Sequence, residues 1–120
     1  MPRALTIYAT LREDLTAAAL TTLAGEVRTH YEALVVAQET NELIAVDLAE
    51  ALCVRLEELL KMAHLLDPES RAHIVGASRY FVSSIDEKPD EDSCTGLDDD
   101  VAVFNHVVRL LGRDDLIITD

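Results

Sequence analysis

Apolar residues recur at spacings of three and four along most of the chain, which is the periodicity of amphipathic helices. The first long run predicts a helix over residues 12–38. Its apolar stripe consists of Leu20, Leu23, Val27, Tyr31 (or His30) and Leu34. Gly25 lies inside this run. It indicates either close packing of another helix or a bend, because glycine there costs about 1 kcal/mol relative to alanine. Residues 1–10 fit either a short extended arm or an additional helical turn.

A second run predicts a helix over residues 41–66. Its main stripe consists of Leu43, Val46, Ala49, Cys53, Leu56, Leu60 and Ala63. A second side is also apolar and consists of Leu48, Leu52, Leu59 and Met62. A helix that is apolar on more than one side is usually central in its bundle. The additional apolar surface is also one that a homodimer would cover.

Three consecutive residues mark the start of a third helix, predicted over residues 68–82. Asp67 suits the cap, Pro68 suits the first helical position, and Glu69 suits the positive end of the helix dipole. Gly76 lies inside this helix and indicates the close approach of another helix.

Residues 83–96 have the composition of a loop, and a fourth helix is predicted over residues 97–111. Its apolar side consists of Val101, Phe104, Val107, Val108 and Leu111. Gly112 is the expected C-terminal cap, and residues 114–120 are expected to dock on the bundle as an extended segment or a short turn. The prediction is one all-α domain over residues 1–120. It is a small four-helix bundle-like fold with an antiparallel pair formed by its first two helices and an acidic loop between its third and fourth.

Composition supports long helices around an aliphatic core. Hydrophobic residues make up 49 % of the 120 residues, but aromatic residues make up only 4 % and tryptophan is absent. The core must therefore be built mainly from leucine, valine, isoleucine and alanine. Glycine (4) and proline (3) are scarce, which favours a few long elements over many short strands.

The formal net charge is −13, from 10 lysines and arginines against 23 aspartates and glutamates. This balance argues against binding nucleic acid through its phosphates, which needs clustered basic residues, and against docking on an anionic membrane. It fits a divalent cation or a basic protein partner. No run approaches the roughly 18 apolar residues of a membrane span. The chain start lacks the form of a signal peptide, and Cys53 and Cys94 are too few for a secreted disulfide framework, so we expect a cytoplasmic protein.

The most distinctive segment runs from Asp86 to Asp100. It holds eight acids against one base, Lys88, so its charge of −7 is more than half of the total of −13. The acids are Asp86, Glu87, Asp90, Glu91, Asp92, Asp98, Asp99 and Asp100. Carboxylates this close together repel one another, and a cation or a basic partner would reduce that repulsion.

The same region carries a set of residue pairs in a recognisable order. They are Tyr80-Phe81, Ser84-Ile85-Asp86, Pro89-Asp90 and Gly96-Leu97-Asp98-Asp99. In order and in most spacings they resemble the YkvA-like domain of unknown function over about residues 67–111. The resemblance implies a small helical fold and singles out the acids among these residues, but it implies no activity. Members of that family tend to carry apolar residues around the Pro-Asp pair, whereas the loop here is polar.

One hypothesis is a divalent-cation site. Hard cations such as Ca²⁺ or Mg²⁺ take oxygen ligands, which Asp86, Asp90, Asp98 and Asp99 could supply. The segment that begins at Asp90 is not an EF-hand loop, because its seventh residue is glycine where the motif has glycine at the sixth, and its twelfth is valine instead of glutamate. The alternative is structural, because acids in the first turn of a helix stabilise it by about 0.3–1 kcal/mol each.

A second hypothesis is a protein-interaction or regulatory module, in which Asp90, Glu91 and Asp92 meet a basic partner and raise the rate and specificity of association. Catalysis is the least favoured reading. The four histidines, His30, His64, His73 and His106, sit in no recognised catalytic or metal motif and are expected at the surface or at the edge of the core. Acids around Cys94 would raise the pKa of its thiol and weaken it as a nucleophile.

Overall fold

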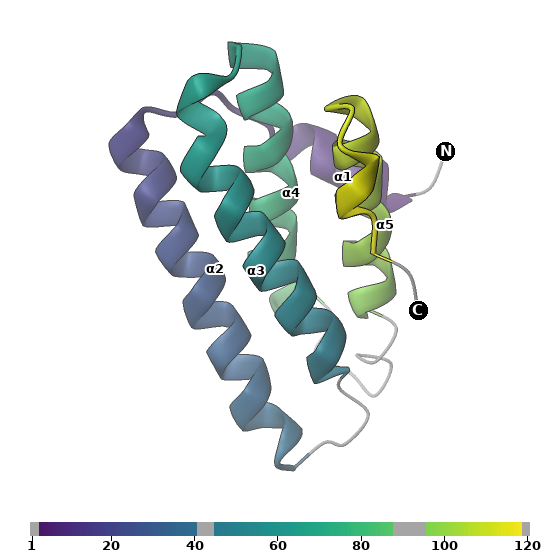
Figure 1. Ribbon diagram of the computed structural model, residues 1–120. Helices are drawn as coiled ribbons and strands as arrows, with labels where there is room; N and C mark the ends of the chain where they lie inside the picture. The colour runs from purple at the N-terminus through teal and green to yellow at the C-terminus, as the bar shows by residue number, and fades with distance from the viewer. Residues whose placement is uncertain (1–2, 41–44, 88–95, 119–120) are drawn as a thin grey trace.

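A computed structural model describes residues 3–40, 45–87 and 96–118, and all of the regular structure in these residues is helical (Figure 1). The α-helices are α1 (Arg3–Leu11), α2 (Ala17–Gln38), α3 (Val46–Met62), α4 (Pro68–Glu87) and α5 (Gly96–Leu110), and two 3₁₀ helices are η1 (Ala63–Leu65) and η3 (Asp114–Leu116). The predicted all-α, bundle-like fold is confirmed. The four predicted helices correspond to α2, α3, α4 and α5, and α1 is additional.

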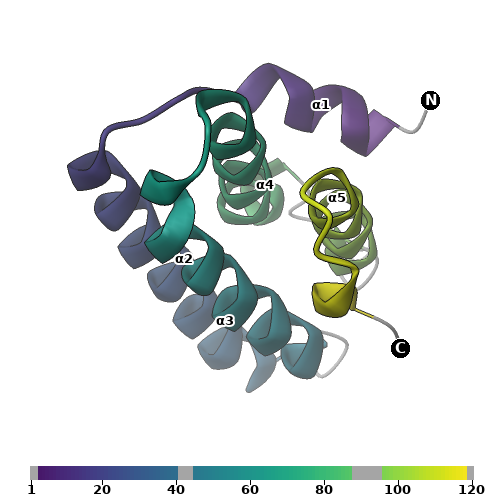
Figure 2. The same cartoon turned by 45° about the horizontal axis from the view of Figure 1, so that its top comes forward.

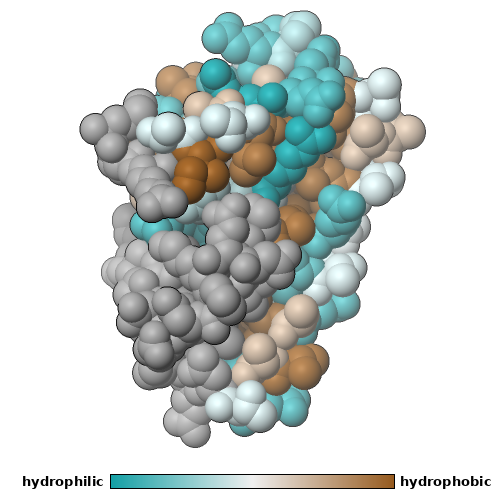
Figure 3. All heavy atoms as spheres, turned by 180° about the vertical axis from the view of Figure 1, so that it is seen from behind, coloured by the Kyte–Doolittle hydropathy of each residue, from teal (hydrophilic) through white to brown (hydrophobic). Residues whose placement is uncertain are grey.

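The helices form three layers. α2 and α3 run side by side in opposite directions, as predicted, and α4 and α5 lie behind them. α1 crosses the outer side of α4 and α5, so that these two helices lie between α1 and the α2–α3 pair (Figure 2). Seen from behind, apolar and polar residues are interleaved over the upper part of the surface, which includes the layer formed by α1 (Figure 3).

The chain breaks between α1 and α2, where the sequence pattern predicted that the first long helix had already begun. The hydroxyl of Thr16 accepts a hydrogen bond of 3.2 Å from the amide of Ala19, which makes Thr16 the N-cap of α2. α2 therefore begins at Ala17 and not at residue 12. Residues 12–16 form the linker that carries the chain from α1 to α2.

The predicted start of α4 is confirmed. Asp67 accepts hydrogen bonds from the amide of Ser70 (3.2 Å) and from its hydroxyl (2.7 Å), and Pro68 is the first residue of the helix. The helix continues to Glu87, so residues 83–87, which were predicted to belong to the loop, are helical. The remainder of the predicted acidic loop, residues 88–95, lies outside the described residues.

α4 is the central helix of the bundle, and it contacts all four of the other α-helices. The prediction that the second long helix is central is therefore wrong. On α3, Leu52 and Leu59 are buried, and Leu48 and Met62 pack half-buried against the core. Other helices of the same chain thus cover the second apolar side of α3. The sequence-based reason for expecting a homodimer, which was that a second copy would cover this side, therefore no longer applies.

The C-terminal segment docks on α5, as predicted. Gly112 adopts a φ of +74°, which is readily accessible only to glycine, and the amides of Gly112 and Arg113 donate to the carbonyls of Arg109 (3.1 Å) and Val108 (2.8 Å). This pair of hydrogen bonds is the pattern of a Schellman cap. After η3, the side-chain amide of Asn105 donates to the carbonyl of Ile118 at 3.0 Å, and its oxygen accepts from the amide of Ile118 at 2.9 Å.

Candidate functional site

The structure describes only part of the predicted acidic site. Asp86 lies in the last turn of α4, and Asp98 lies in the first turn of α5. The predicted partner-binding residues Asp90, Glu91 and Asp92 lie outside the described residues. The three consecutive acids Asp98, Asp99 and Asp100 do begin a helix, which is the position where carboxylates stabilise the helix dipole. The side chain of Asp99 is half-buried and that of Asp100 is buried, so these two do not form a solvated surface cluster.

The described residues contain no group of three or more histidine, cysteine, aspartate or glutamate side chains arranged to hold a metal ion. The predicted cation ligands Asp86 and Asp90 therefore remain a prediction, as do Asp98 and Asp99, because the proposed set includes residues that the structure does not describe.

An acidic surface among the described side chains lies on the α2–α3 pair. Glu32, Val36 and Glu39 follow at spacings of four and three along α2, and Asp47, Glu50 and Val54 follow at three and four along α3. These spacings place each triplet on one side of its helix, and all six side chains are exposed. We call these six residues the α2–α3 face.

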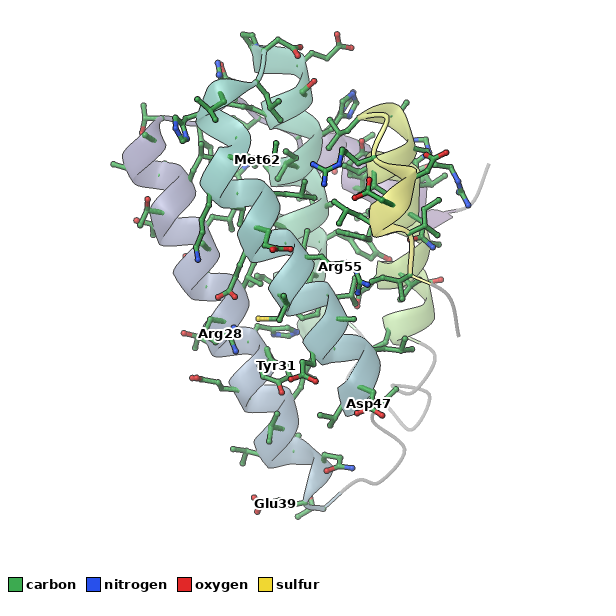
Figure 4. The ribbon with its side chains drawn as sticks, viewed as in Figure 1. Arg28, Tyr31, Glu39, Asp47, Arg55 and Met62 are labelled. Atoms are coloured by element: carbon green, nitrogen blue, oxygen red, sulfur yellow. The ribbon has the colours of Figure 1, made fainter. Side chains whose placement is uncertain are left out.

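An ion pair joins the two helices beside this face. The guanidinium of Arg28 donates to both carboxylate oxygens of Glu57, at 2.7 and 3.1 Å, and lies 5.5 Å from the centre of the Tyr31 ring. The hydrogen bond to Glu57 raises the pKa of Arg28 above its ordinary value. Arg28 and Tyr31 lie on the side of α2 toward α3, while Glu39 and Asp47 lie at the end of the pair where α2 ends and α3 begins (Figure 4).

The electrostatics at Cys53 show that carboxylates from both helices gather in this region. The pKa of the Cys53 thiol is raised to about 11, first by burial and then by the charges of Glu57, Glu32 and Glu50, against the opposing effect of Arg28. One arginine therefore stands among three glutamates, and it is already bonded to one of them. The α2–α3 face holds four carboxylates and no base.

A groove of about 640 Å³ lies on another side of α2, toward Val82 of α4. Besides Val82, it is lined by Thr22, Gly25, Glu26, Thr29, His30 and Ala33. The ring of His30 is buried and packs edge-on against the ring of Phe81, with centroids 4.8 Å apart. This is the core-edge position that the sequence predicted for a histidine, and the groove contains one carboxylate and mostly small side chains.

A second polar cluster, which sequence reasoning missed, lies where α1 meets α4 and α5. The hydroxyl of Tyr8 is 2.6 Å from Nδ1 of His73, and the two rings stack with centroids 6.3 Å apart. The ring of His106 meets the Tyr8 ring edge-on at 5.8 Å. The Tyr8 ring also packs on Gly76, where a Cβ would lie 2.9 Å from the Tyr8 atoms Cδ1 and Cε1, so the predicted close approach at Gly76 is confirmed.

We call this cluster, which comprises Tyr8, Arg12, His73 and His106, the Tyr8–His73 junction. Burial and the charge of Arg12 oppose each other at Tyr8 but act in the same direction at His73. Burial raises the pKa of Tyr8 above its ordinary value. Burial, Arg12 and His106 hold the pKa of His73 below its ordinary value, against the opposing effects of Glu69 on α4 and of the cap residue Asp67. Both Tyr8 and His73 are therefore neutral near pH 7. The signal in the sequence was weak, because Tyr8 and His73 are 65 residues apart.

Comparisons of the chain with protein-family models, with curated proteins and with solved structures gave no match. Within the described residues, no helix combines the length and the apolar character needed to cross a membrane.

Proposed function

We propose that this protein is a non-catalytic interaction or regulatory module whose acidic surface binds a basic segment of a protein partner. The observation that carries the proposal is the charge imbalance of the exposed surface. Among the side chains that the structure describes, the exposed acids are Glu13, Asp14, Glu26, Glu32, Glu39, Asp47, Glu50, Glu58, Asp67, Glu69, Asp114 and Asp115. The exposed lysines and arginines in the same part of the chain are Arg12, Lys61 and Arg109.

Four half-buried arginines are engaged in ion pairs within the chain. Arg28 pairs with Glu57 at 2.7 Å, Arg71 with Asp14 at 2.7 Å, Arg79 with Glu13 at 2.9 Å and Arg113 with Asp115 at 3.0 Å. These pairs use one acid for each base, so the excess of carboxylates is left at the surface. A surface of one sign steers an oppositely charged partner toward it and discriminates against others.

The α2–α3 face offers such a partner apolar contacts as well as negative charge. Val36 and Val54 stand among its four carboxylates and are 64 % and 42 % exposed. An amphipathic helix with lysine or arginine on one side and apolar residues beside them would meet both chemistries at once. The loop acids Asp90, Glu91 and Asp92, which lie outside the described residues, remain a predicted partner-binding site of their own.

The test uses a fluorescent amphipathic peptide rich in lysine and leucine, and a scrambled peptide of the same composition. Anisotropy titrations are run at about 50 and 500 mM salt, across which screening of surface charge increases sharply. Glu32→Gln/Glu50→Gln removes two acids of the α2–α3 face. Glu26→Gln/Glu69→Gln is the matched control, because it also removes two exposed glutamates, one from the groove side of α2 and one from the first turn of α4.

We expect tighter binding of the amphipathic peptide than of the scrambled one, weaker binding at high salt, and a larger loss in the face variant than in the control. Asp90→Asn/Glu91→Gln/Asp92→Asn then measures the contribution of the loop. Equal affinity of the two double variants shows that net charge, not the α2–α3 face, attracts the peptide. Binding that ignores salt contradicts the charge-based proposal as a whole.

A further inference from the structure

The packing of α1 depends on a small polar contact inside an otherwise apolar interface. Leu5, Ile7 and Leu11 pack half-buried against the core, and Tyr8 between them is 3 % exposed. The Tyr8 hydroxyl reaches His73 on α4 at 2.6 Å. α1 thus lies on α4 and α5 with a titratable side chain directly beneath it.

Charged and titratable groups face His73 from every element around it. Tyr8 comes from α1, Arg12 from the linker and His106 from α5. Glu69 in the first turn of α4 and the cap residue Asp67 lie on the side of its own helix. Arg12 and His106 oppose a positive charge on His73, while the two acids favour one more weakly.

Protonation of His73 therefore places a cation in a half-buried site beside Arg12. Tyr8 cannot offset that charge as a phenolate, because burial keeps its hydroxyl protonated. The Tyr8 oxygen can only accept a hydrogen bond from the charged ring. The largest unfavourable effect, which is lost hydration, disappears when α1 moves away, and repulsion by the exposed Arg12 side chain is then weakened by solvent.

We propose that the Tyr8–His73 junction is a pH-sensitive contact, in which α1 is docked on α4 and α5 while His73 is neutral and is released as His73 takes up a proton.

The sign follows from linkage. With α1 docked, the pKa of His73 lies below its ordinary value of about 6.5, whereas with α1 released it returns toward that value. The released state therefore binds protons more readily. Docking is at full strength above about pH 6.5 and weakens as the pH falls through that value. Each unit of difference between the two pKa values changes the ratio of docked to released α1 roughly tenfold.

The linker stays attached to α4 over the same pH range. Arg71 holds Asp14 at 2.7 Å and lowers the pKa of that carboxylate, so the pair stays ionised at pH 5. Arg79 holds Glu13 at 2.9 Å and donates to the carbonyl of Leu11 at 3.1 Å. Release would therefore free the part of α1 that precedes Leu11, exposing its apolar side together with the surface of α4 and α5 that it covers, while Leu11, Glu13 and Asp14 stay attached to α4.

Amide hydrogen exchange followed by NMR between pH 7.5 and 5.0 tests the proposal, with rates corrected for the intrinsic effect of pH. We expect protection of α1 amides to fall with pH while protection of α3 amides stays constant. His73→Gln keeps a polar side chain without a titration and should make α1 protection independent of pH. His64→Gln is the matched control, because His64 is exposed, and it should behave as the wild type.

Arg12→Gln gives a second readout that does not depend on how well His73→Gln folds. It removes a cation that disfavours charge on His73, so it should raise the NMR titration midpoint of His73 and reduce the pH dependence of α1 protection. The proposal is overturned if α1 and α3 lose protection in parallel. It is also overturned if His73→Gln docks α1 and retains the wild-type pH dependence, or if Arg12→Gln leaves both quantities unchanged.

Discussion

Alanine at Gly76 and alanine at Gly25 should have opposite effects on stability, although both glycines lie inside long helices. Each substitution gains about 0.5–1 kcal/mol of helix stability, because alanine restricts the unfolded chain and favours the helix. At Gly25 no atom would lie within 4 Å of the new Cβ, so nothing opposes that gain. Close packing is therefore not the reason for this glycine, in contrast to one of the two expectations from sequence.

At Gly76 the new Cβ would lie 2.7 Å from Cγ of Arg12 and 2.9 Å from two ring atoms of Tyr8. The Arg12 side chain is exposed and can move, but the Tyr8 ring is buried and rigid. Overpacking of this kind costs about 1–3 kcal/mol. Since the gain in helix propensity is common to both sites, the two alanine variants should differ by about 1–3 kcal/mol, with Gly76→Ala the less stable.

Urea unfolding followed by circular dichroism measures this difference, since the midpoint and slope give the free energy of unfolding. Hydrogen exchange locates it, because the loss at position 76 should appear first as reduced protection of α1. A Gly76→Ala protein that is stabilised as much as Gly25→Ala, with α1 fully protected, would refute the packing of Tyr8 on α4.

Three further outcomes follow from the structure. Asn105→Ala removes both hydrogen bonds to the backbone of Ile118 and should lower the free energy of unfolding by about 1–3 kcal/mol, whereas Asn105→Asp keeps the acceptor and should lose less in urea unfolding. Cys53 is fully buried with a pKa of about 11, so in a variant without the other cysteine it should react with a thiol reagent at pH 8 only as fast as the protein opens. If the predicted cation site exists, millimolar Ca²⁺ or Mg²⁺ should raise the melting temperature of the wild type but not of Asp98→Asn/Asp99→Asn, and a wild type that shows no shift rejects the site.

Long apolar periodicity and cap residues were enough to predict α2 to α5, but α1 was left open. Residues 3–11 contain Thr6, Ile7 and Thr10, whose branched side chains weaken the helical signal, and only packing on α4 and α5 decides their conformation. The start of α2 was available in the sequence, because Thr16 directly precedes three alanines. The end of α4 could not be predicted from the sequence, because Ser83 and Ser84 are as common in loops as near the ends of helices.

The α2–α3 face and the Tyr8–His73 junction also differ in how far the sequence predicts them. The acidic side chains of the α2–α3 face follow from helical spacing once the helix boundaries are known. The Tyr8–His73 junction does not, because periodicity within a segment gives no information about which distant segment will cover it. His73 was expected at the surface or core edge, and its half-buried position is consistent with that expectation, but its partner lies 65 residues earlier.

The distance along the chain between α1 and the helices it packs on also affects how the protein is made. α2 and α3 are neighbours in sequence and can pair as soon as both have been synthesised, whereas α1 contacts α4 and α5, which are made later. At about 5–20 residues per second, the 98 residues from Tyr8 to His106 take roughly 5–20 s to synthesise. α1 therefore has its complete packing surface only after both α4 and α5 have been synthesised, so it can reach its final place only after α2 and α3 have been able to pair.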